Sequence, residues 1–306
     1  MAQAPSSWLA NPTQTRAVLD DFGLYTKHRL GQNFLVNDSV ITRILDLANL
    51  GEKDVVFEVG PGIGTLTVAL LRHAGAVCSV EADRTLAPVL AETCSRDSER
   101  FALLMGDALK VDADQLREAV DGLGIEGLDP SPTMLVSNLP YQVAASIILQ
   151  TFEQMPTVRR AVVMVQAEVA DRISAQPGGK TYGAYTAKLS LYGRVTGRFE
   201  VSPGNFMPPP HVDSAVVRID REPATDPQTG AILTEARLSH VRNVIDAAFA
   251  QRRKTIRNSM SSSGFDKQAL DAAFESTGIS PTTRAEKLDT ADFIRLADAL
   301  PAGGEA

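Results

Sequence analysis

Four short motifs contain the residue types needed to bind a nucleoside and to act on an amine. In chain order they are Glu58-Val59-Gly60-Pro61-Gly62-Ile63-Gly64, Glu81, Asp107 and Asn138-Leu139-Pro140-Tyr141. Glycines such as Gly60 and Gly62 permit positive φ angles and let a ligand approach the backbone. A carboxylate at Glu81 can accept both hydroxyls of a ribose, and one at Asp107 can accept the adenine amino group. These motifs predict a site for a cofactor that contains adenosine.

The spacing of the glycines leaves two cofactor classes open. A dinucleotide fingerprint reads GxGxxG, whereas the turn from Gly60 to Gly64 reads GxGxG. The acidic residues further along the chain add to this difference. Together they favour S-adenosylmethionine, with S-adenosylhomocysteine as its product, over a nicotinamide dinucleotide.

The tetrapeptide Asn138-Leu139-Pro140-Tyr141 fits the methylation of an amine on a nucleobase. The exocyclic nitrogen of adenine is a poor nucleophile because its lone pair is delocalised into the ring. If the Asn138 side-chain oxygen and a backbone carbonyl accept its two N–H groups, the lone pair can point at a sulfonium methyl. Pro140 stiffens the turn, and Tyr141 offers a stacking surface for the base. We expect Phe206, which precedes a run of prolines, to face Tyr141 across that base.

Each of these motifs follows a predicted strand, and the strands alternate with helical segments. This alternation predicts a parallel sheet with right-handed crossovers and helices on both faces. Ligands of such sheets bind outside the carboxyl ends of the strands, so the four motifs should meet at one crevice. Strands are predicted over residues 54–59, 76–80, 101–105, 133–136, 161–166, 195–201 and 214–219.

The last two predicted strands have no helix between them, which indicates an antiparallel edge. After residue 221 the composition changes to Pro, Asp, Thr and Gly, and only helical patterns follow. We therefore predict an α/β fold, a Rossmann-like class I methyltransferase domain with a mostly parallel doubly wound sheet, over residues 25–221. Residues 222–306 are predicted to form a small all-helical domain that binds RNA, and residues 1–24 a flexible N-terminal extension.

The net charge of −7 does not exclude nucleic acid as a partner, because phosphate is bound by local basic surfaces. Between residues 157 and 198, seven basic residues are opposed by only two acidic ones. Two shorter clusters contain the residues that we expect to contact RNA. They are Lys27 and Arg29 near the N-terminus, and Arg252, Arg253, Lys254 and Arg257.

The sequence also indicates the cellular compartment in which we expect the protein. It has no apolar run of the roughly 20 residues needed to span a bilayer, and residues 1–11 lack the features of a secretory signal. Its two cysteines, Cys78 and Cys94, lie in no CxxC motif and near no histidine pair. We expect a cytoplasmic monomer with no metal, no disulfide and no contact with a membrane.

Together these motifs resemble the ribosomal RNA adenine N6,N6-dimethyltransferase family, and within it the bacterial branch that acts on the small subunit. The resemblance extends from about Tyr25 to Ala297. Further motifs that carry it are Gly31-Gln32-Asn33-Phe34-Leu35, Gly106-Asp107-Ala108, Pro208-Pro209-Pro210-His211-Val212-Asp213-Ser214, Arg252-Arg253-Lys254-Thr255-Ile256-Arg257-Asn258 and Arg284-Ala285-Glu286.

The resemblance implies roles for individual residues and a substrate for the protein. Gln32, Asn33 and Leu35 would close over the cofactor, and Ala108 would join Asp107 at the adenine. The family dimethylates two adjacent adenosines in a hairpin near the 3′ end of 16S rRNA, within a preassembled small ribosomal subunit. The basic clusters would then contact rRNA, and a checkpoint role in ribosome assembly could accompany the catalysis.

Two alternatives stay open beside this interpretation. The first is a 23S rRNA adenine methyltransferase that confers antibiotic resistance. Such enzymes typically have Ile after the catalytic Asn, so Leu139 and the Arg252 region count against it. The second is a non-catalytic ribosome-assembly or transcription factor on the same fold, and the intact set of motif residues counts against that. A nicotinamide dehydrogenase is a more distant candidate.

Overall fold

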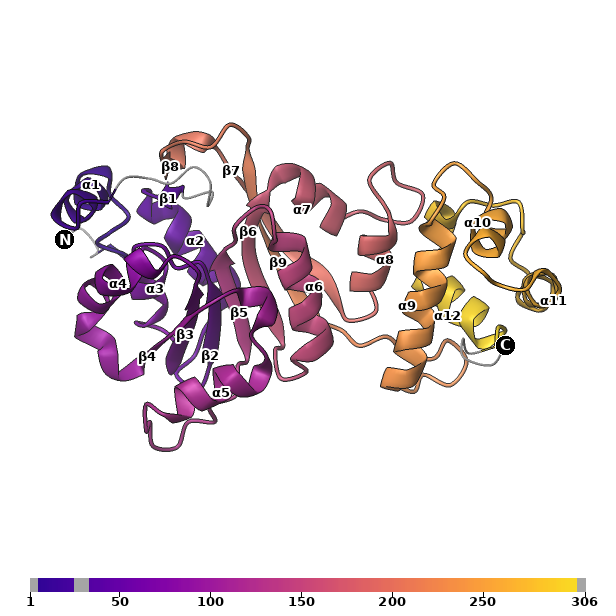
Figure 1. Cartoon of the computed structure of the whole chain (residues 1–306), viewed down its shortest axis with the longest axis horizontal. Helices are drawn as coiled ribbons and strands as arrows, with labels where there is room; N and C mark the ends of the chain where they lie inside the picture. The colour runs from indigo at the N-terminus through magenta and orange to yellow at the C-terminus, as the bar shows by residue number, and fades with distance from the viewer. Residues whose placement is uncertain (1–4, 25–32, 302–306) are drawn as a thin grey trace. The chain divides into compact units, whose positions relative to one another are not determined.

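The computed structural model describes residues 5–24 and 33–301. One part of the chain forms a seven-stranded sheet in the order β4-β3-β2-β5-β6-β9-β7, with helices on both sides (Figure 1). β4, β3, β2, β5 and β6 run parallel, and β9 pairs antiparallel with β6. The predicted sheet with an antiparallel edge is therefore confirmed. Its strands are β2 Val55–Val59, β3 Ala76–Glu81, β4 Phe101–Met105, β5 Met134–Asn138, β6 Arg160–Gln166, β7 Gly193–Val201 and β9 Ser214–Arg221.

The central strands are rich in β-branched residues and are covered on both faces. Every residue of β2 and β3 is buried, as expected of parallel strands between two layers of helices. On one face, Val56 of β2 packs in a core cluster with Ile41 and Ile44 of α2 (Asp38–Ala48). Two short strands, β1 Phe34–Leu35 and β8 Phe206–Met207, pair antiparallel beside this sheet.

Helices alternate with the parallel strands, as predicted, and only helical elements follow residue 221 in the described part of the chain apart from one isolated β-bridge. The helix after the glycine turn is only four residues long. No helix in the described residues is both long and apolar enough to cross a membrane. Besides α2, the helices are α1 Pro12–Asp21, α3 Thr67–Leu70, α4 Ala87–Thr93, α5 Ala113–Asp121, α6 Ala144–Gln154, α7 Ala167–Ile173, α8 Ala184–Leu189, α9 Glu235–Phe249, α10 Ile256–Ser262, α11 Lys267–Thr277 and α12 Thr290–Asp298.

The described part of the N-terminal segment differs from the predicted flexible extension. Asn11 caps α1 by accepting the backbone N–H groups of Thr13 and Gln14, and Leu9 is fully buried in the core cluster. The backbone N–H of Ser7 donates to Asp38 Oδ1 at 2.8 Å, which fixes the segment to the start of α2. Residues 5–24 thus form part of the packed structure.

The chain divides into two compact units, and the division differs from the predicted boundary at residue 222. The first unit contains the chain up to Ala170 together with Val195–Arg221, and the second contains Asp171–Arg194 and the chain from Glu222 onward. The segment Asp171–Arg194 groups with the C-terminal helices because its side chains pack there. Tyr182 contacts Phe249 of α9 edge to face, and Lys188 Nζ lies 2.9 Å from Asp246 Oδ1.

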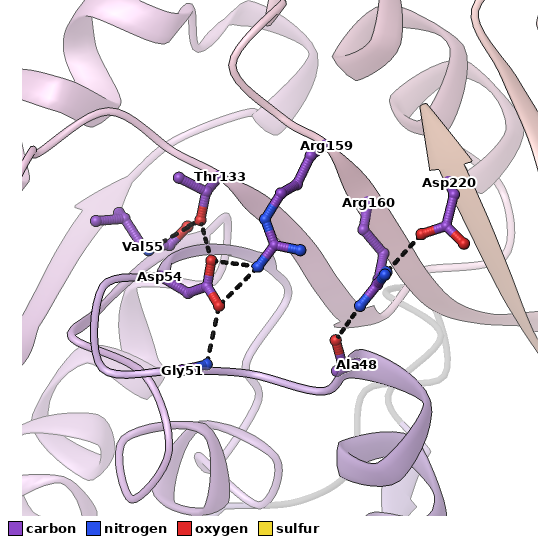
Figure 2. A network of polar contacts seen from close by, with 8 residues as sticks. All are labelled: Ala48, Gly51, Asp54, Val55, Thr133, Arg159, Arg160 and Asp220. Atoms are coloured by element: carbon purple, nitrogen blue, oxygen red, sulfur yellow. Dashed lines mark hydrogen bonds and ion pairs between the residues drawn. The ribbon is translucent and has the colours of Figure 1, made fainter. Parts of the chain in front are cut away.

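A polar network holds together the strand ends that lie away from the motif residues (Figure 2). Asp54, just before β2, accepts hydrogen bonds from Arg159 Nη2 at 2.7 and 2.8 Å and from Thr133 Oγ1 at 2.8 Å. These three residues precede β2, β6 and β5, so one carboxylate fixes the starts of three adjacent strands. Beside them, Arg160 Nη1 donates to the carbonyl of Ala48 at 2.8 Å and Arg160 Nε to Asp220 Oδ1.

Both cysteines are free and buried. Cys78 of β3 is 1% exposed and Cys94, which follows α4, is 2% exposed. Burial raises the pKa of each thiol to about 12. Both side chains therefore stay protonated and serve as apolar filling of the core.

Candidate active site

The predicted site residues meet around one cavity of about 440 Å³ at the carboxyl ends of four parallel strands. After β2 the chain adds β3 and β4 on one side and then β5 and β6 on the other. Such a reversal is where open α/β sheets bind ligands. The predicted residues that line the cavity are Asn33, Leu35, Gly60, Gly62, Glu81, Asp107, Ala108, Asn138, Leu139, Pro140 and Tyr141.

The glycine turn after β2 needs both its backbone shape and its lack of side chains. Gly60 and Gly62 have φ angles of +67° and +62°, which other residues adopt only with strain. A Cβ at Gly60 would lie 3.3 Å from Pro140 Cγ, and one at Gly62 would lie 3.1 Å from Phe34 Cε1. The turn therefore packs closely against both the tetrapeptide and β1 while its backbone borders the cavity.

Glu81 ends β3 with its carboxylate held by backbone donors. Oε1 accepts the N–H of Asp83 at 2.8 Å, and Oε2 accepts the N–H of Gly62 at 3.4 Å. Burial raises the pKa of Glu81, although these backbone hydrogen bonds lower it in part. The carboxylate is thus fixed in direction beside the glycine turn and can accept hydroxyl donors from the cavity.

Asp107 follows β4 and lines the cavity with a side chain that is 53% exposed. Its Oδ1 accepts the backbone N–H of Leu109 at 3.0 Å, which caps a short 3-10 helix at Ala108–Lys110. The cap holds the carboxylate at the cavity edge. A base amino group could donate to it there.

Asn138, the last residue of β5, has an amide whose orientation suits an acceptor role. Its Nδ2 donates to the backbone carbonyl of Asn33 at 3.4 Å. Because the amide nitrogen is used in this way, Oδ1 is the atom that Asn138 can present to a donor. The backbone N–H of Leu139 donates to Met164 of β6 at 3.1 Å, which fixes the start of the turn.

Tyr141 is anchored through its hydroxyl. Tyr141 Oη and Ser214 Oγ lie 2.7 Å apart in a hydrogen bond. Ser214 is fully buried at the start of β9, where it pairs in register with Gln166 of β6. Burial raises the pKa of Tyr141, and this hydrogen bond lowers it in part. The ring of Tyr141 therefore stays neutral and directed at one wall of the cavity.

Of the predicted catalytic residues, which all lie in the described part of the chain, Phe206 alone does not line this cavity. Phe206 is 4% exposed within the core cluster, where β8 pairs it with Leu35, and it does not line the cavity. Its position differs from the expectation that it faces Tyr141 across a base. Gln32, Lys27 and Arg29 lie outside the described residues.

The residues of the second unit that were predicted to contact RNA differ in their exposure and in their partners. Arg252, Arg253 and Lys254 are exposed in the turn before α10. Arg257 instead donates to Asp271 of α11, with Nη2 and Oδ2 2.7 Å apart. Its charge is partly neutralised within the unit.

Three residues of the first unit belong to the site or its support although the sequence analysis gave none of them a role of its own. Glu58 and Thr65 line the cavity, and Ser214 positions Tyr141. Glu58 Oε2 accepts hydrogen bonds from Thr67 Oγ1 at 2.8 Å and Ser79 Oγ at 2.7 Å. The signal available was position alone, since Glu58 and Thr65 flank the glycine turn and Ser214 ends the proline-rich motif.

The site and the sheet together define a Rossmann-like methyltransferase. The glycine turn follows the first parallel strand, acidic residues follow the next two, and the tetrapeptide follows the fourth, all on one cavity. Residues 23–301 match the family model described as ribosomal RNA adenine dimethylase. The chain belongs to that family.

Similar proteins cover nearly the whole chain. A protein named Ribosomal RNA small subunit methyltransferase A from Thermobifida fusca (strain YX) is 40% identical over 297 residues, which is 96% of each chain. A protein of the same name from Corynebacterium diphtheriae is 39% identical and covers 100% of both chains.

Two solved structures share the fold. A dimethyladenosine transferase from Plasmodium falciparum has a TM-score of 0.69 at 24% identity and covers 86% of this chain and 95% of its own. The 23S rRNA methyltransferase ErmE has a TM-score of 0.64 at 25% identity and covers 88% of this chain and 99% of its own.

Proposed function

We propose that this protein dimethylates the N6 amines of two adjacent adenosines in a hairpin near the 3′ end of 16S rRNA, using S-adenosylmethionine. The observation that carries the proposal is that the Asn138–Tyr141 turn shares one cavity with Gly60, Glu81 and Asp107. A cofactor and a base could meet there. The names of relatives that match the chain over nearly its full length support the small subunit as the substrate.

The residues present fit the cofactor. S-adenosylmethionine supplies an electrophilic methyl group bound to a sulfonium. Glu81 would accept the ribose hydroxyls, and Asp107 with Ala108 would hold the adenine. The Gly60–Gly62 backbone would approach the methionine part, while Gln32, Asn33 and Leu35 would close over it. One observation of the cavity supports this fit: the Thr65 hydroxyl is buried there with no hydrogen-bond partner.

The turn after β5 would prepare the amine. Asn138 Oδ1 and a backbone carbonyl would accept the two N–H groups of the target nitrogen, and Tyr141 would stack on the base. The nitrogen then forms its bond to the methyl carbon as the carbon–sulfur bond breaks. The methylated amine loses its extra proton to water, so the reaction requires no strong base. The gain comes chiefly from holding the two groups in line.

A second candidate is methylation of 23S rRNA, which the likeness to ErmE favours. Leu139 in the tetrapeptide and the identity of about 40% to proteins named for the small subunit favour the first candidate. The two candidates predict different substrates, so one experiment separates them. A role as an assembly checkpoint would add to the first candidate without replacing it.

The test is the transfer of labelled methyl groups to purified small subunits that lack the modification, with large subunits in parallel. We expect two methyl groups on each of two adenosines of the small subunit. Asn138→Ala should reduce transfer by about 100-fold or more, a usual cost of losing one positioned catalytic contact, while cofactor affinity falls much less. Transfer to large subunits alone would establish the second candidate, and transfer to neither would favour a binding factor.

A further inference from the structure

Thr65 is a buried hydroxyl without a partner beside the cavity. It directly follows the glycine turn, the residue is 5% exposed, and its Oγ1 makes no hydrogen bond. Thr67, two residues further, donates its own hydroxyl to Glu58. A buried polar group that lacks a partner destabilises a fold, so such groups in native proteins call for an explanation.

The charges around the cavity indicate what a hydroxyl could do there. Among the described residues that line it, the ionisable acids are Glu58, Glu81 and Asp107, and none of the lining residues is basic. A ligand carboxylate in this cavity would therefore be bound by neutral donors. The other lining hydroxyl, that of Tyr141, is already hydrogen-bonded to Ser214. Thr65 is the hydroxyl left to act as such a donor within the described lining.

The order of the strands shows which part of a cofactor would lie near Thr65. Asp107 follows β4, Glu81 ends β3, and Thr65 lies in the turn after β2. With adenine at Asp107 and ribose at Glu81, the next position along the strand ends is the β2 turn. The amino-acid end of the cofactor would reach that turn, and the methyl group would face Asn138 after β5.

We propose that Thr65 Oγ1 donates a hydrogen bond to the carboxylate of the methionine part of S-adenosylmethionine. The inference rests on the proposed function, because it takes the cofactor as given. A hydrogen bond to a carboxylate is charge-assisted and stronger than a neutral one. Thr65 is then a positioning residue that sets the depth at which the sulfonium lies before Asn138.

The test compares two ligands that differ in the amino-acid part. Thr65→Val keeps the shape of the side chain and removes the hydroxyl. Calorimetry should show S-adenosylhomocysteine binding about tenfold more weakly to this variant, a usual loss for a hydrogen bond to a charged group. Binding of 5′-methylthioadenosine, which lacks the carboxylate, should be unchanged. Thr65→Ser, which restores the hydroxyl, should recover most of the affinity.

The melting temperature of the free protein provides a second readout. Thr65→Val should melt at the same or a higher temperature, because it removes a buried hydroxyl that has no partner. Ser7→Ala is the matched control, since Ser7 Oγ is also buried without a partner but Ser7 does not line the cavity. It should behave like Thr65→Val in melting and like the unchanged protein in binding both ligands.

The outcomes separate this inference from the proposed function. If Thr65→Val binds S-adenosylhomocysteine as the unchanged protein does, the inference is overturned. It is also overturned if both ligands weaken in parallel, because the hydroxyl would then act on the nucleoside or the local fold. If the unchanged protein binds neither ligand, the proposed function itself fails.

Discussion

Glu58 places a carboxyl group inside a strand whose other residues are apolar. Burial raises the pKa of Glu58 to about 7 from 4.5, although hydrogen bonds from Ser79 and Thr67 lower it in part. In the unfolded chain the group loses its proton near pH 4.5, whereas in the folded protein it keeps the proton until about pH 7. Between these values the folded state binds more protons, so its stability falls as the pH rises.

We expect Glu58→Gln to remove this part of the pH dependence. In the unchanged protein, Glu58 should lower the free energy of unfolding by about 3 kcal/mol between pH 4.5 and 7, since each unit of pKa difference corresponds to about 1.4 kcal/mol. The variant has no such proton to lose. Urea unfolding at pH 5 and pH 8 measures the difference. An equal loss of stability in both proteins would show that Glu58 does not titrate as described.

For single residues, the sequence predicted where they lie in the fold but not whether they are protonated or hydrogen-bonded. Asn138 and Glu81 could be placed because each ends a strand, and Asp107 because it closely follows one, since parallel strands end at one edge of a sheet. The protonation of Glu58 and the unpaired hydroxyl of Thr65 depend on neighbours that only the packed structure supplies. Ser214, 73 residues from Tyr141, could not be recognised as its partner.

Among the elements, β5 and β9 are linked across the site by the Tyr141–Ser214 hydrogen bond. The loop before β9 is also joined to the start of α7, directly after β6, because the N–H of Ala167 donates to the carbonyl of Asp213 at 2.9 Å. These two hydrogen bonds attach the Asn138–Tyr141 turn and the end of the proline-rich motif to the same part of the sheet. The hydroxyl pair fixes the direction of the Tyr141 ring.

Removal of either hydroxyl should free that ring. We expect Ser214→Ala and Tyr141→Phe each to slow single-turnover methyl transfer several-fold at unchanged cofactor affinity. The double variant should be no slower than the slower single variant, because both changes break the same contact. Ser214→Thr, which keeps a hydroxyl, is the control. Additive losses in the double variant would mean that the two side chains act separately.

The elements also explain why Phe206 lies away from the predicted place. β8 is only two residues long, and its pairing with β1 buries Phe206 against Leu35 in the core. So short a strand carries no periodic pattern from which pairing could be predicted. The long central strands were predictable because continuous apolar runs between turns are typical of buried parallel strands.

In the molecule as a whole, a net charge of −7 coexists with a basic turn in the second unit. Arg252, Arg253 and Lys254 are exposed there, while Arg257 is engaged by Asp271. Attraction to phosphate depends on such local cations.

The second unit itself was only partly predictable from the sequence. A change of composition marks one of its boundaries, but it cannot show that Asp171–Arg194 packs with helices much later in the chain.

The basic turn should determine the salt dependence of binding to the small subunit. Replacing both Arg253 and Lys254 with Ala should weaken binding and reduce the slope of log affinity against log salt by about 2, roughly one for each lost phosphate contact. Arg257→Ala is the matched control and should change the slope much less. Filter binding over a range of salt concentrations measures both slopes. Equal slopes in the unchanged protein, the double variant and Arg257→Ala would contradict the assignment of Arg253 and Lys254 as phosphate contacts.

The burial of both cysteines has a practical consequence. The thiolate is the form of cysteine that attacks thiol reagents, and neither Cys78 nor Cys94 is exposed or ionised near neutral pH. The two native cysteines should therefore not react with a thiol label, and they need not be replaced before site-directed labelling. A single cysteine introduced at Val212, which is 44% exposed in the proline-rich motif, would carry a photocrosslinker or a fluorophore alone. It could then report which nucleotides come near that loop.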